Sequence, residues 1–401
     1  MRIARREFLK GLGAGGLTAA LTSGSVAFAA PGAAASRFVF VLLRGGLDGL
    51  SAVPAWGDPD FERARAGIAL APPGAPRGAL DLDGFFGLHP ELPQLHARWQ
   101  AGELAVLHAH CGPYRERSHF DAQNVLEHGG LQPYGLRTGW LNRAIAELDA
   151  RDAVEAGARG IAIASAMPLA LRGDATVTSW APSILPSPEA DLLDRVERMY
   201  GDDVRLASAF AEARMANVVA GDAMGGGRRG DLPVLMGAAA RFLSAPSGPR
   251  IAMVEAGGWD THAGQEQPQG ALARNLRQLD AGLETLRTGL GEHWADTAVL
   301  VLTEFGRTVA MNGSAGTDHG TGGAGFLLGG AVRGGRVVAD WPGLGRRDLH
   351  EGRDLRATLD TRALIKGALH EHLGLEAPAL AAVFPGSEDV RPVTGLVRAR
   401  S

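Results

Sequence analysis

Residues 38–43 read FVFVLL, and RGGLDGLS follows directly at residues 44–51. An apolar run without polar alternation predicts a β-strand that is buried on both faces. The turn that closes this strand is rich in glycine and carries one carboxylate, Asp48. Five further apolar runs end in glycine-rich or polar turns in the same way, at residues 104–108, 161–164, 251–255, 298–303 and 326–328.

Longer segments with helical periodicity lie between or after these runs, at residues 88–100, 118–127, 189–220, 269–290 and 358–373. Strands that alternate with helices predict an α/β protein with a mostly parallel, doubly wound sheet flanked by helices. Glycine-rich links at residues 71–78 and 221–230 are expected to be surface loops, not boundaries between domains. We therefore expect one α/β domain over residues 30–401.

The composition excludes several classes of protein. The chain has 401 residues, with 40 Lys and Arg against 44 Asp and Glu, which gives a formal net charge of −4 at pH 7. Hydrophobic residues make up 45%, which argues against intrinsic disorder, and the single cysteine, Cys111, excludes an intrachain disulfide framework. The nearly balanced charge does not favour a nucleic acid as a partner.

Residues 1–29 have the features of an export signal. Arg5 and Arg6 open the sequence RREFLK, which resembles the twin-arginine export motif, and an uncharged stretch rich in Gly and Ala leads to AFA at residues 27–29. This stretch is too rich in small and polar residues to insert strongly into a bilayer. We expect a cleaved signal, no stable membrane span, the twin-arginine export machinery as a partner, and a mature protein in the periplasm or outside the cell.

Acidic and imidazole side chains gather at the ends of the predicted strands. The sequences GGWDTH and LTEFGRT each end or follow a strand, and GTDHG precedes the last one. Ligand sites in open α/β sheets lie beyond the carboxyl ends of the strands, and carboxylates that meet there repel one another unless a cation joins them. We therefore predict a divalent-metal site, with Zn, Mn, Mg and Ca all open. The predicted ligands are Asp48, Asp260, His262, Glu304 and His319.

Each of these residues also has a structural explanation, and the sequence leaves both open. Asp48 and Asp318 are suited to glycine-rich turns. Asp260 is suited to capping the helix that follows it. Glu304 can form an ion pair with Arg307, three residues later.

Ser118 opens the predicted helix at residues 118–127. Ser118 and Asp121 resemble a capping box. A hydroxyl at a helix N-terminus is also a candidate nucleophile, because that end of a helix favours anions and a metal can activate the hydroxyl. Guanidinium groups that can clamp phosphate or sulfate oxygens are those of Arg307, Arg44, Arg115 and Arg117.

Taken in order, these motifs resemble a known family. LLRGGLDGLSAV, GELAVLHA, RSHFDAQNVLE, GGWDTH, LTEFGRT and NGSAGTDHGTGGAGFLLGGAVRGG are similar to the motifs of domain-of-unknown-function family 1501, a group of twin-arginine-exported bacterial proteins. That family resembles the alkaline phosphatase and sulfatase superfamily. The resemblance implies an alkaline phosphatase-like fold and two divalent ions that bridge a phosphate or sulfate ester.

Carried over by residue, the resemblance implies a nucleophile and a set of metal ligands, namely Ser118 with Asp48, Asp260, His262, Glu304 and His319. One position departs from the superfamily. Its Asp-His-Gly sequence reads Glu304-Phe305-Gly306 here, so one imidazole ligand is missing.

Two functions of different kinds follow. The first is an exported, metal-dependent hydrolase or transferase that acts on a phosphate or sulfate ester of a small molecule or glycan. The alternative is a non-catalytic envelope or binding protein that retains a degenerate phosphatase-like fold, which the missing imidazole favours. A weaker third reading is a module that stacks sugars on tryptophan side chains, namely Trp56, Trp140, Trp180 and Trp259.

Overall fold

The computed structural model describes residues 36–399, except for 153–158, 183–189, 222–229 and 266–269. The predicted export signal at residues 1–29 and most of the predicted link at 221–230 therefore lie outside the described residues. Within the described part of the chain, no helix has both the length and the apolar character needed to cross a membrane.

Nine strands of the described chain form one sheet in the order β10-β4-β9-β8-β1-β7-β5-β6, with β11 also paired to β4. They are β1 (Arg37–Leu43), β4 (Leu104–Cys111), β5 (Gly160–Ile163), β6 (Val177–Trp180), β7 (Ile251–Ala256), β8 (Thr297–Thr303), β9 (Gly323–Leu328), β10 (Arg336–Val338) and β11 (Leu359–Asp360). A separate ribbon pairs β2 (Leu80–Asp81) with β3 (Gly87–Leu88). All six predicted apolar runs are strands of the large sheet.

The predicted mostly parallel sheet is confirmed. β1 lies in the middle and pairs in parallel with β7 and β8. Among the described strands of this sheet, only β9 runs antiparallel to its neighbours, β4 and β8. This reversal arises because β9 returns directly after β8, so the connection at residues 304–322 begins and ends at the same edge of the sheet.

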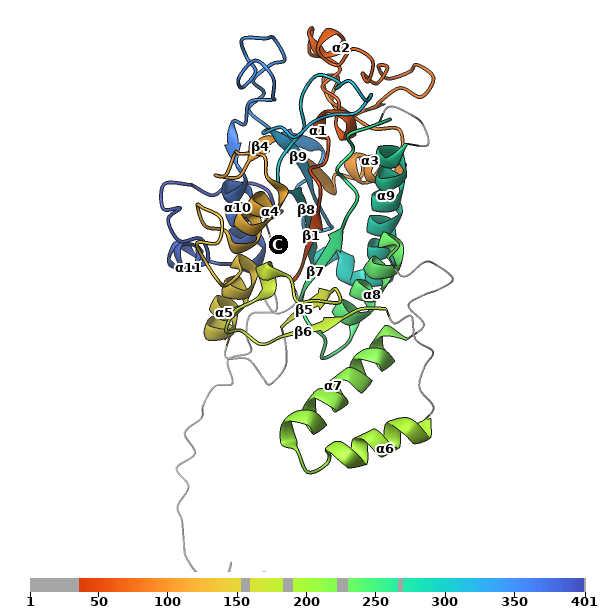
Figure 1. The fold of residues 1–401 in the computed structure, drawn as a ribbon, viewed down its shortest axis with the longest axis vertical. Coiled ribbons are helices and arrows are strands. Elements are labelled where there is room, and N and C mark those ends of the chain that lie inside the picture. Colours follow the sequence, from red (N-terminus) through yellow and green to blue (C-terminus); the bar gives the residue numbers. More distant parts are fainter. Residues whose placement is uncertain (1–35, 153–158, 183–189, 222–229, 266–269, 400–401) are drawn as a thin grey trace, which may run out of the picture.

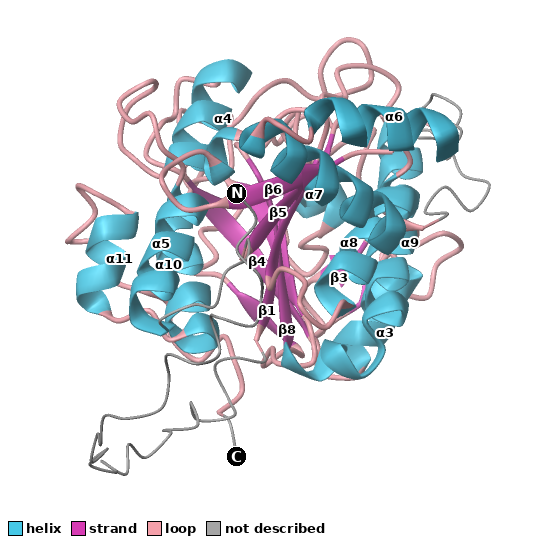
Figure 2. Ribbon diagram, turned by 90° about the horizontal axis from the view of Figure 1, so that it is seen from below, coloured by secondary structure: helices cyan, strands magenta, loops and turns pink. Residues whose placement is uncertain are grey.

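Helices cover both faces of the sheet (Figures 1 and 2). They are α1 (Gly49–Ala52), α2 (Phe61–Ala64), α3 (Pro93–Gln100), α4 (His119–His128), α5 (Trp140–Asp152), α6 (Ala190–Tyr200), α7 (Val204–Ala220), α8 (Leu232–Ser244), α9 (Ala271–Leu290), α10 (Thr361–Leu373) and α11 (Ala377–Val383). α3, α8 and α9 pack on one face, and α4, α5, α10 and α11 lie on the other (Figure 1).

Alternate residues of β1 enter two separate apolar cores. Val39 and Val41 are fully buried in the core that α8 and α9 share. Phe38 and Phe40 are fully buried in the other core, where the ring of Phe40 lies 5.1 Å from that of Trp140. A strand whose two faces are both covered must be apolar throughout, which explains the unbroken apolar sequence of residues 38–43.

Four strands end at the same edge of the sheet. β1, β7 and β8 are parallel, and β4 points the same way because β9 is antiparallel to both β4 and β8. The connections that follow these four strands therefore meet at their carboxyl ends, where ligand sites of open α/β sheets lie.

Candidate metal centre

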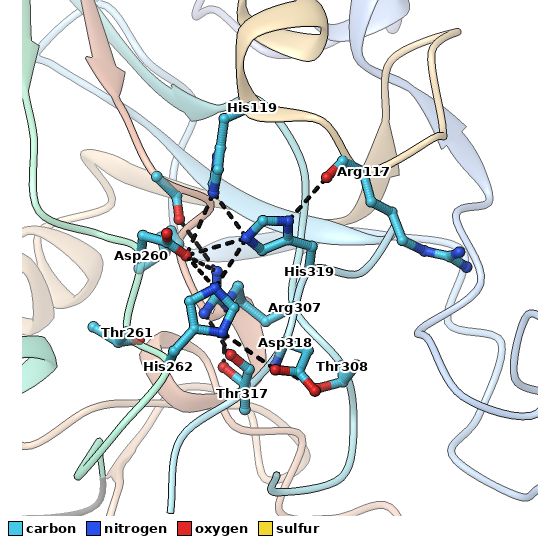
Figure 3. A network of polar contacts seen from close by, with 12 residues as sticks. Arg117, His119, Asp260, Thr261, His262, Arg307, Thr308, Thr317, Asp318 and His319 are labelled. Carbon is cyan, nitrogen blue, oxygen red and sulfur yellow. Dashed lines mark hydrogen bonds and ion pairs between the residues drawn. The ribbon is translucent and has the colours of Figure 1, made fainter. Parts of the chain in front are cut away.

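Four polar side chains converge at this edge of the sheet (Figure 3). We call His119, Asp260, His262 and His319 the His–Asp cluster. The Nε2 atom of His319 lies 2.9 Å from Nε2 of His119 and 3.0 Å from Nε2 of His262. Oδ1 of Asp260 lies 2.9 Å from Nε2 of His262, 3.3 Å from Nε2 of His319 and 3.4 Å from Nε2 of His119.

An oxygen holds each imidazole ring from its opposite side. The contacts are His119 Nδ1 to Glu304 Oε1 at 2.7 Å, His319 Nδ1 to the Arg117 carbonyl at 2.9 Å, and His262 Nδ1 to Asp318 Oδ1 at 3.2 Å. Carbonyl and carboxylate oxygens only accept hydrogen bonds, so we assign the proton of each ring to Nδ1, the nitrogen that faces these oxygens. In the neutral rings, the Nε2 atoms therefore present lone pairs to one another.

This donor set fits a divalent metal ion. Lone pairs of nitrogen about 3 Å apart repel unless a cation joins them, and metal-bound histidines commonly donate their second ring nitrogen to a carboxylate or carbonyl. Ligands about 2.0–2.1 Å from a tetrahedral zinc ion lie roughly 3.3 Å apart, which is close to the separations in the cluster. The ligand atoms of His119, Asp260 and His319 all lie within 4.8 Å of one another.

Glu304 lies behind the cluster and holds His119. Its side chain is fully buried, and its Oε1 atom also accepts hydrogen bonds from the Gly45 N–H at 2.8 Å and from Gln123 at 2.9 Å. Burial raises the pKa of Glu304, but the hydrogen bonds from His119, Gln123 and the backbone outweigh it and hold that pKa below its ordinary value. Glu304, a predicted ligand, therefore contacts the ring of His119 and does not reach the Nε2 atoms that converge in the cluster.

Arg307 is the partner of Asp260. Its buried guanidinium donates from Nη1 to Asp260 Oδ1 at 2.5 Å and from Nε to Thr317 Oγ1 at 3.2 Å. Burial raises the pKa of Asp260, but the hydrogen bond and charge of Arg307 outweigh burial and hold that pKa below its ordinary value. A guanidinium without exposed surface faces Asp260 and not solvent, in contrast to the predicted clamp for a substrate anion.

Asp48 lies outside the His–Asp cluster. It is 1% exposed and forms a buried ion pair with Arg65, at 2.7 Å between Oδ2 and Nη2. Ser51 and Gln265 also donate hydrogen bonds to its carboxylate. Through Gln265, this group is joined to Thr317, whose hydroxyl lies 2.9 Å from Gln265 Oε1. Asp48 is therefore connected to the neighbourhood of the cluster, but not to its converging atoms.

Ser118 stands at the N-cap position of α4 and is half-buried, but its side chain makes no capping hydrogen bond, so the capping-box interpretation is wrong. Its hydroxyl instead contacts the phenol of Tyr114, which also donates to Asp121 at 3.1 Å. In the described residues, no hydrogen bond joins Ser118 to the cluster. Its neighbour His119 is the residue of this segment that enters it.

Backbone geometry at two positions lets the connections meet. Gly45 has a φ of +122°, and a Cβ atom on it would lie 2.5 Å from the backbone nitrogen of Asp260, so a side chain there would push the β1 and β7 connections apart. Arg117 adopts a φ of +64°, which is unusual for a residue with a side chain. Its carbonyl is the one that holds His319.

Phe305 packs against the imidazoles at the position where the superfamily implies a further ligand. It is 3% exposed, and its ring centre lies 4.7 Å from that of His119 and 5.2 Å from that of His319. The departure noted in the sequence therefore places an apolar wall beside the cluster. Of the four tryptophans considered for sugar stacking, Trp140 and Trp259 are buried in the apolar cores.

His119 and Asp318 are not among the site residues that the sequence predicts. His119 stands in the motif RSHFD, where the predicted site residue is its neighbour Ser118. Asp318 stands in GTDHG and was treated as a turn residue. The signal that could have found His119 is its position after the strand at residues 104–108, which ends at the same edge as the other three.

The chain matches one protein family and is similar to several solved structures. A family model described as "Protein of unknown function (DUF1501)" matches residues 105–384. No curated protein matches the chain. Among solved structures, the C-terminal periplasmic domain of EcEptC from Escherichia coli, in complex with Zn, is similar to it at a TM-score of 0.36 and 10% identity, over 73% of each chain.

Two further structures are similar over most of the chain. The lipoteichoic acid synthase LtaP from Listeria monocytogenes has a TM-score of 0.38 and 10% identity, over 85% of this chain and 72% of its own. The phosphonate monoester hydrolase of Agrobacterium radiobacter has a TM-score of 0.36 and 11% identity, over 84% and 74%. At such low identities and TM-scores, none of them assigns an activity to this chain.

Proposed function

The chain belongs to the DUF1501 family, and we propose that it is an exported, metal-dependent hydrolase or transferase that acts on a phosphate or sulfate ester. The observation that carries this proposal is the His–Asp cluster, in which three anchored imidazoles turn their Nε2 atoms toward one carboxylate oxygen. Export rests on the twin-arginine motif at Arg5 and Arg6, outside the described residues.

We assign the metal ligands to His119, Asp260, His262 and His319. Three imidazole nitrogens favour Zn²⁺ over Mn²⁺, Mg²⁺ and Ca²⁺, which prefer oxygen ligands. A bound divalent ion supplies a Lewis acid for an ester oxygen and lowers the pKa of a hydroxyl.

The surrounding residues have positioning roles in this proposal. Glu304 and Asp318 fix the orientation of His119 and His262 and make their Nε2 atoms more basic. Arg307 holds Asp260 in place and keeps it ionised. Asp48 then stabilises the fold beneath the site through its ion pair with Arg65.

Ser118 is the proposed nucleophile. Its hydroxyl is free of a capping role, and it stands at the N-terminus of α4, where backbone N–H groups favour an anionic ester. The Ser118 oxygen would form a bond to phosphorus or sulfur as the alcohol departs with a proton. Water or a second alcohol would then release the group from Ser118, which gives hydrolysis or transfer respectively.

One observation favours a second candidate, a binding protein without catalytic activity. Phe305 fills the place of an implied imidazole, and the described residues contain one candidate metal cluster. A single ion held by the His–Asp cluster can serve a structural role.

Metal content is the first test of the proposed function. Protein recovered from the periplasm without chelators or metal-affinity resin is expected to carry about one divalent ion per chain, measured by elemental mass spectrometry. Folded protein without bound metal, which also fails to take up Zn²⁺ or Mn²⁺ in a titration, would contradict the assignment.

Turnover by the loaded protein separates the two candidates. Phosphomonoesters, phosphodiesters and aryl sulfates are assayed with the wild type, with Ser118→Ala and with Ser314→Ala as a control at an exposed serine. We expect turnover that Ser118→Ala abolishes and Ser314→Ala preserves, with metal content equal in all three. Bound metal without turnover of any ester favours the binding protein.

A further inference from the structure

A surface pocket of about 430 Å³ adjoins the His–Asp cluster on the other side of Asp318. Its polar lining comes from Arg63, Thr308, Asn312, Asp318, Arg346 and Arg353, and the remainder is largely apolar. A volume of this size is in the usual range for pockets that hold small molecules.

Two residues of the pocket contact two residues of the cluster. Asp318 Oδ1 lies 3.2 Å from Nδ1 of His262, and Arg353 donates to the carbonyl oxygen of His319 at 2.9 Å. The side chains of His262 and Asp318 are 43% and 51% exposed, so the cluster and the pocket are both open to solvent at this pair. One ligand can therefore extend from the cluster into the pocket.

The three arginines of the pocket differ in whether a carboxylate already pairs with the guanidinium. Arg63 pairs with Asp60, and Arg353 pairs with the buried Asp354 at 2.9 Å. Arg346 is exposed and makes no hydrogen bond or ion pair with any residue that the structure describes. The one carboxylate in the lining, Asp318, is held by Asn312 at 3.0 Å as well as by His262. The pocket thus has a net positive lining with one uncommitted guanidinium.

We propose that this pocket binds a second anionic group, a phosphate or a sulfate, of the substrate whose ester lies at the His–Asp cluster. The proposal rests on the proposed function and narrows its substrate class to esters that carry at least two anionic groups. A guanidinium presents paired N–H donors that match two oxygens of a phosphate or sulfate, and Arg346 has these donors available. The apolar part of the lining suits the carbon skeleton that joins the two groups.

Matched pairs of esters test whether the pocket binds a second anionic group and whether that group is a phosphate or a sulfate. The pairs are glucose 6-phosphate with glucose 1,6-bisphosphate, and glucosamine 6-sulfate with the N,6-disulfate. In the metal-loaded wild type, the doubly charged member of one pair is expected to have the higher kcat/KM. Arg346→Ala should lower this preference roughly tenfold through KM, the scale of one lost charge-assisted contact. Arg347→Ala is the control, because this exposed neighbour does not line the pocket.

Binding measured without turnover keeps the two proposals distinguishable. If the wild type turns over none of these esters, calorimetric titration with the same four compounds still tests the pocket. Tighter binding of a doubly charged compound that Arg346→Ala weakens and Arg347→Ala preserves supports the pocket, even though the proposed reaction then fails for these esters. The pocket proposal is overturned if both variants change the preference equally, or if the wild type shows no preference in either turnover or binding.

Discussion

Asp48 and Asp260 follow closely similar sequences, but one side chain is buried and the other is partly exposed. Each follows a strand of the sheet and two glycines with one apolar residue, in GGLD and GGWD. Each also pairs with a buried arginine, Arg65 or Arg307. Yet the side chain of Asp48 is 2% exposed, whereas that of Asp260 is 42% exposed.

The neighbours of the two carboxylates explain the difference. Asp48 is surrounded by hydrogen-bond donors from Arg65, Ser51 and Gln265, so its charge is satisfied by the protein itself. Asp260 accepts one hydrogen bond, from Arg307, and otherwise faces the Nε2 atoms of the three histidines in the cluster. Donors that already satisfy a carboxylate make it structural, whereas lone pairs around a carboxylate create a place for a cation.

The largest expected effect is on the stability of the Asp48 region. Asp48→Asn leaves the charge of Arg65 buried without an anion, so the free energy of unfolding should fall by about 3–5 kcal/mol. Urea unfolding measures this loss, and adding Arg65→Met should recover part of it. A loss below about 1 kcal/mol would show that the pair is not the structural element we describe.

The second prediction concerns Asp260, where metal affinity should change more than stability. Asp260→Asn removes the charge of a proposed ligand. Affinity for Zn²⁺ or Mn²⁺ should therefore fall by more than roughly 100-fold, which is the largest loss usual for mutating a residue that only orients a ligand. Asparagine keeps an acceptor for Arg307, and water reaches this position, so unfolding should change less than in Asp48→Asn. Calorimetric titration and urea unfolding test the two halves of this contrast. If Asp48→Asn lowered metal affinity as much as Asp260→Asn does, the contrast between the two carboxylates would be wrong.

A smaller effect is expected at Glu304, behind His119. Glu304→Gln retains the size of the side chain but weakens the hold on Nδ1, so metal affinity should fall roughly 10- to 100-fold. Glu292→Gln, at an exposed position, serves as the control. If Glu304→Gln abolished binding as fully as Asp260→Asn, Glu304 would be a ligand, as the sequence first suggested.

The smallest effect is a dependence of stability on pH. Burial raises the pKa of Asp48, but the charge and hydrogen bonds of Arg65, with Gln265 and Ser51, outweigh it and lower that pKa below its ordinary value. A lowered pKa contributes stability that is complete above the unfolded-state value of about 3.9 and is lost as the pH falls through the folded-state value. Metal-free wild type should therefore lose more stability below about pH 4 than the Asp48→Asn, Arg65→Met double variant. Parallel pH profiles in urea unfolding would exclude this contribution.

Much of the fold could be predicted because its strands are buried on both faces. Residues 38–43 and 298–302 are continuous apolar runs, unlike the mixed polar and apolar pattern of a surface helix. The sequence analysis did not predict α8, whose sequence LPVLMGAAARFLS is largely apolar and contains one charged residue, Arg241. The direction of β9 could not be predicted, because a short apolar run carries no information about its partner.

For the site, the sequence could predict which segments meet at one edge of the sheet, but not which side chains of those segments touch. The sequence identified Asp260, His262 and His319 as neighbours at one edge, and the structure brings them together. It could not rank residues within that edge. Whether Glu304 reaches the converging atoms or stops behind His119 depends on the depth of one side chain, and spacing along the chain does not encode that depth.

The central position of β1 determines when the chain can fold during synthesis. Phe38 pairs with Ile251 on one side and Ala298 on the other, so the earliest strand of the sheet has neither neighbour until the ribosome has translated most of the message. His119 likewise waits for residues 260 and 319. Contacts between such distant segments form slowly, and partly made chains expose apolar strands in the meantime. A nascent chain that stops before residue 251 therefore has no completed sheet, and the His–Asp cluster cannot form before residue 319 is made, so the proposed metal ion can bind only late in synthesis.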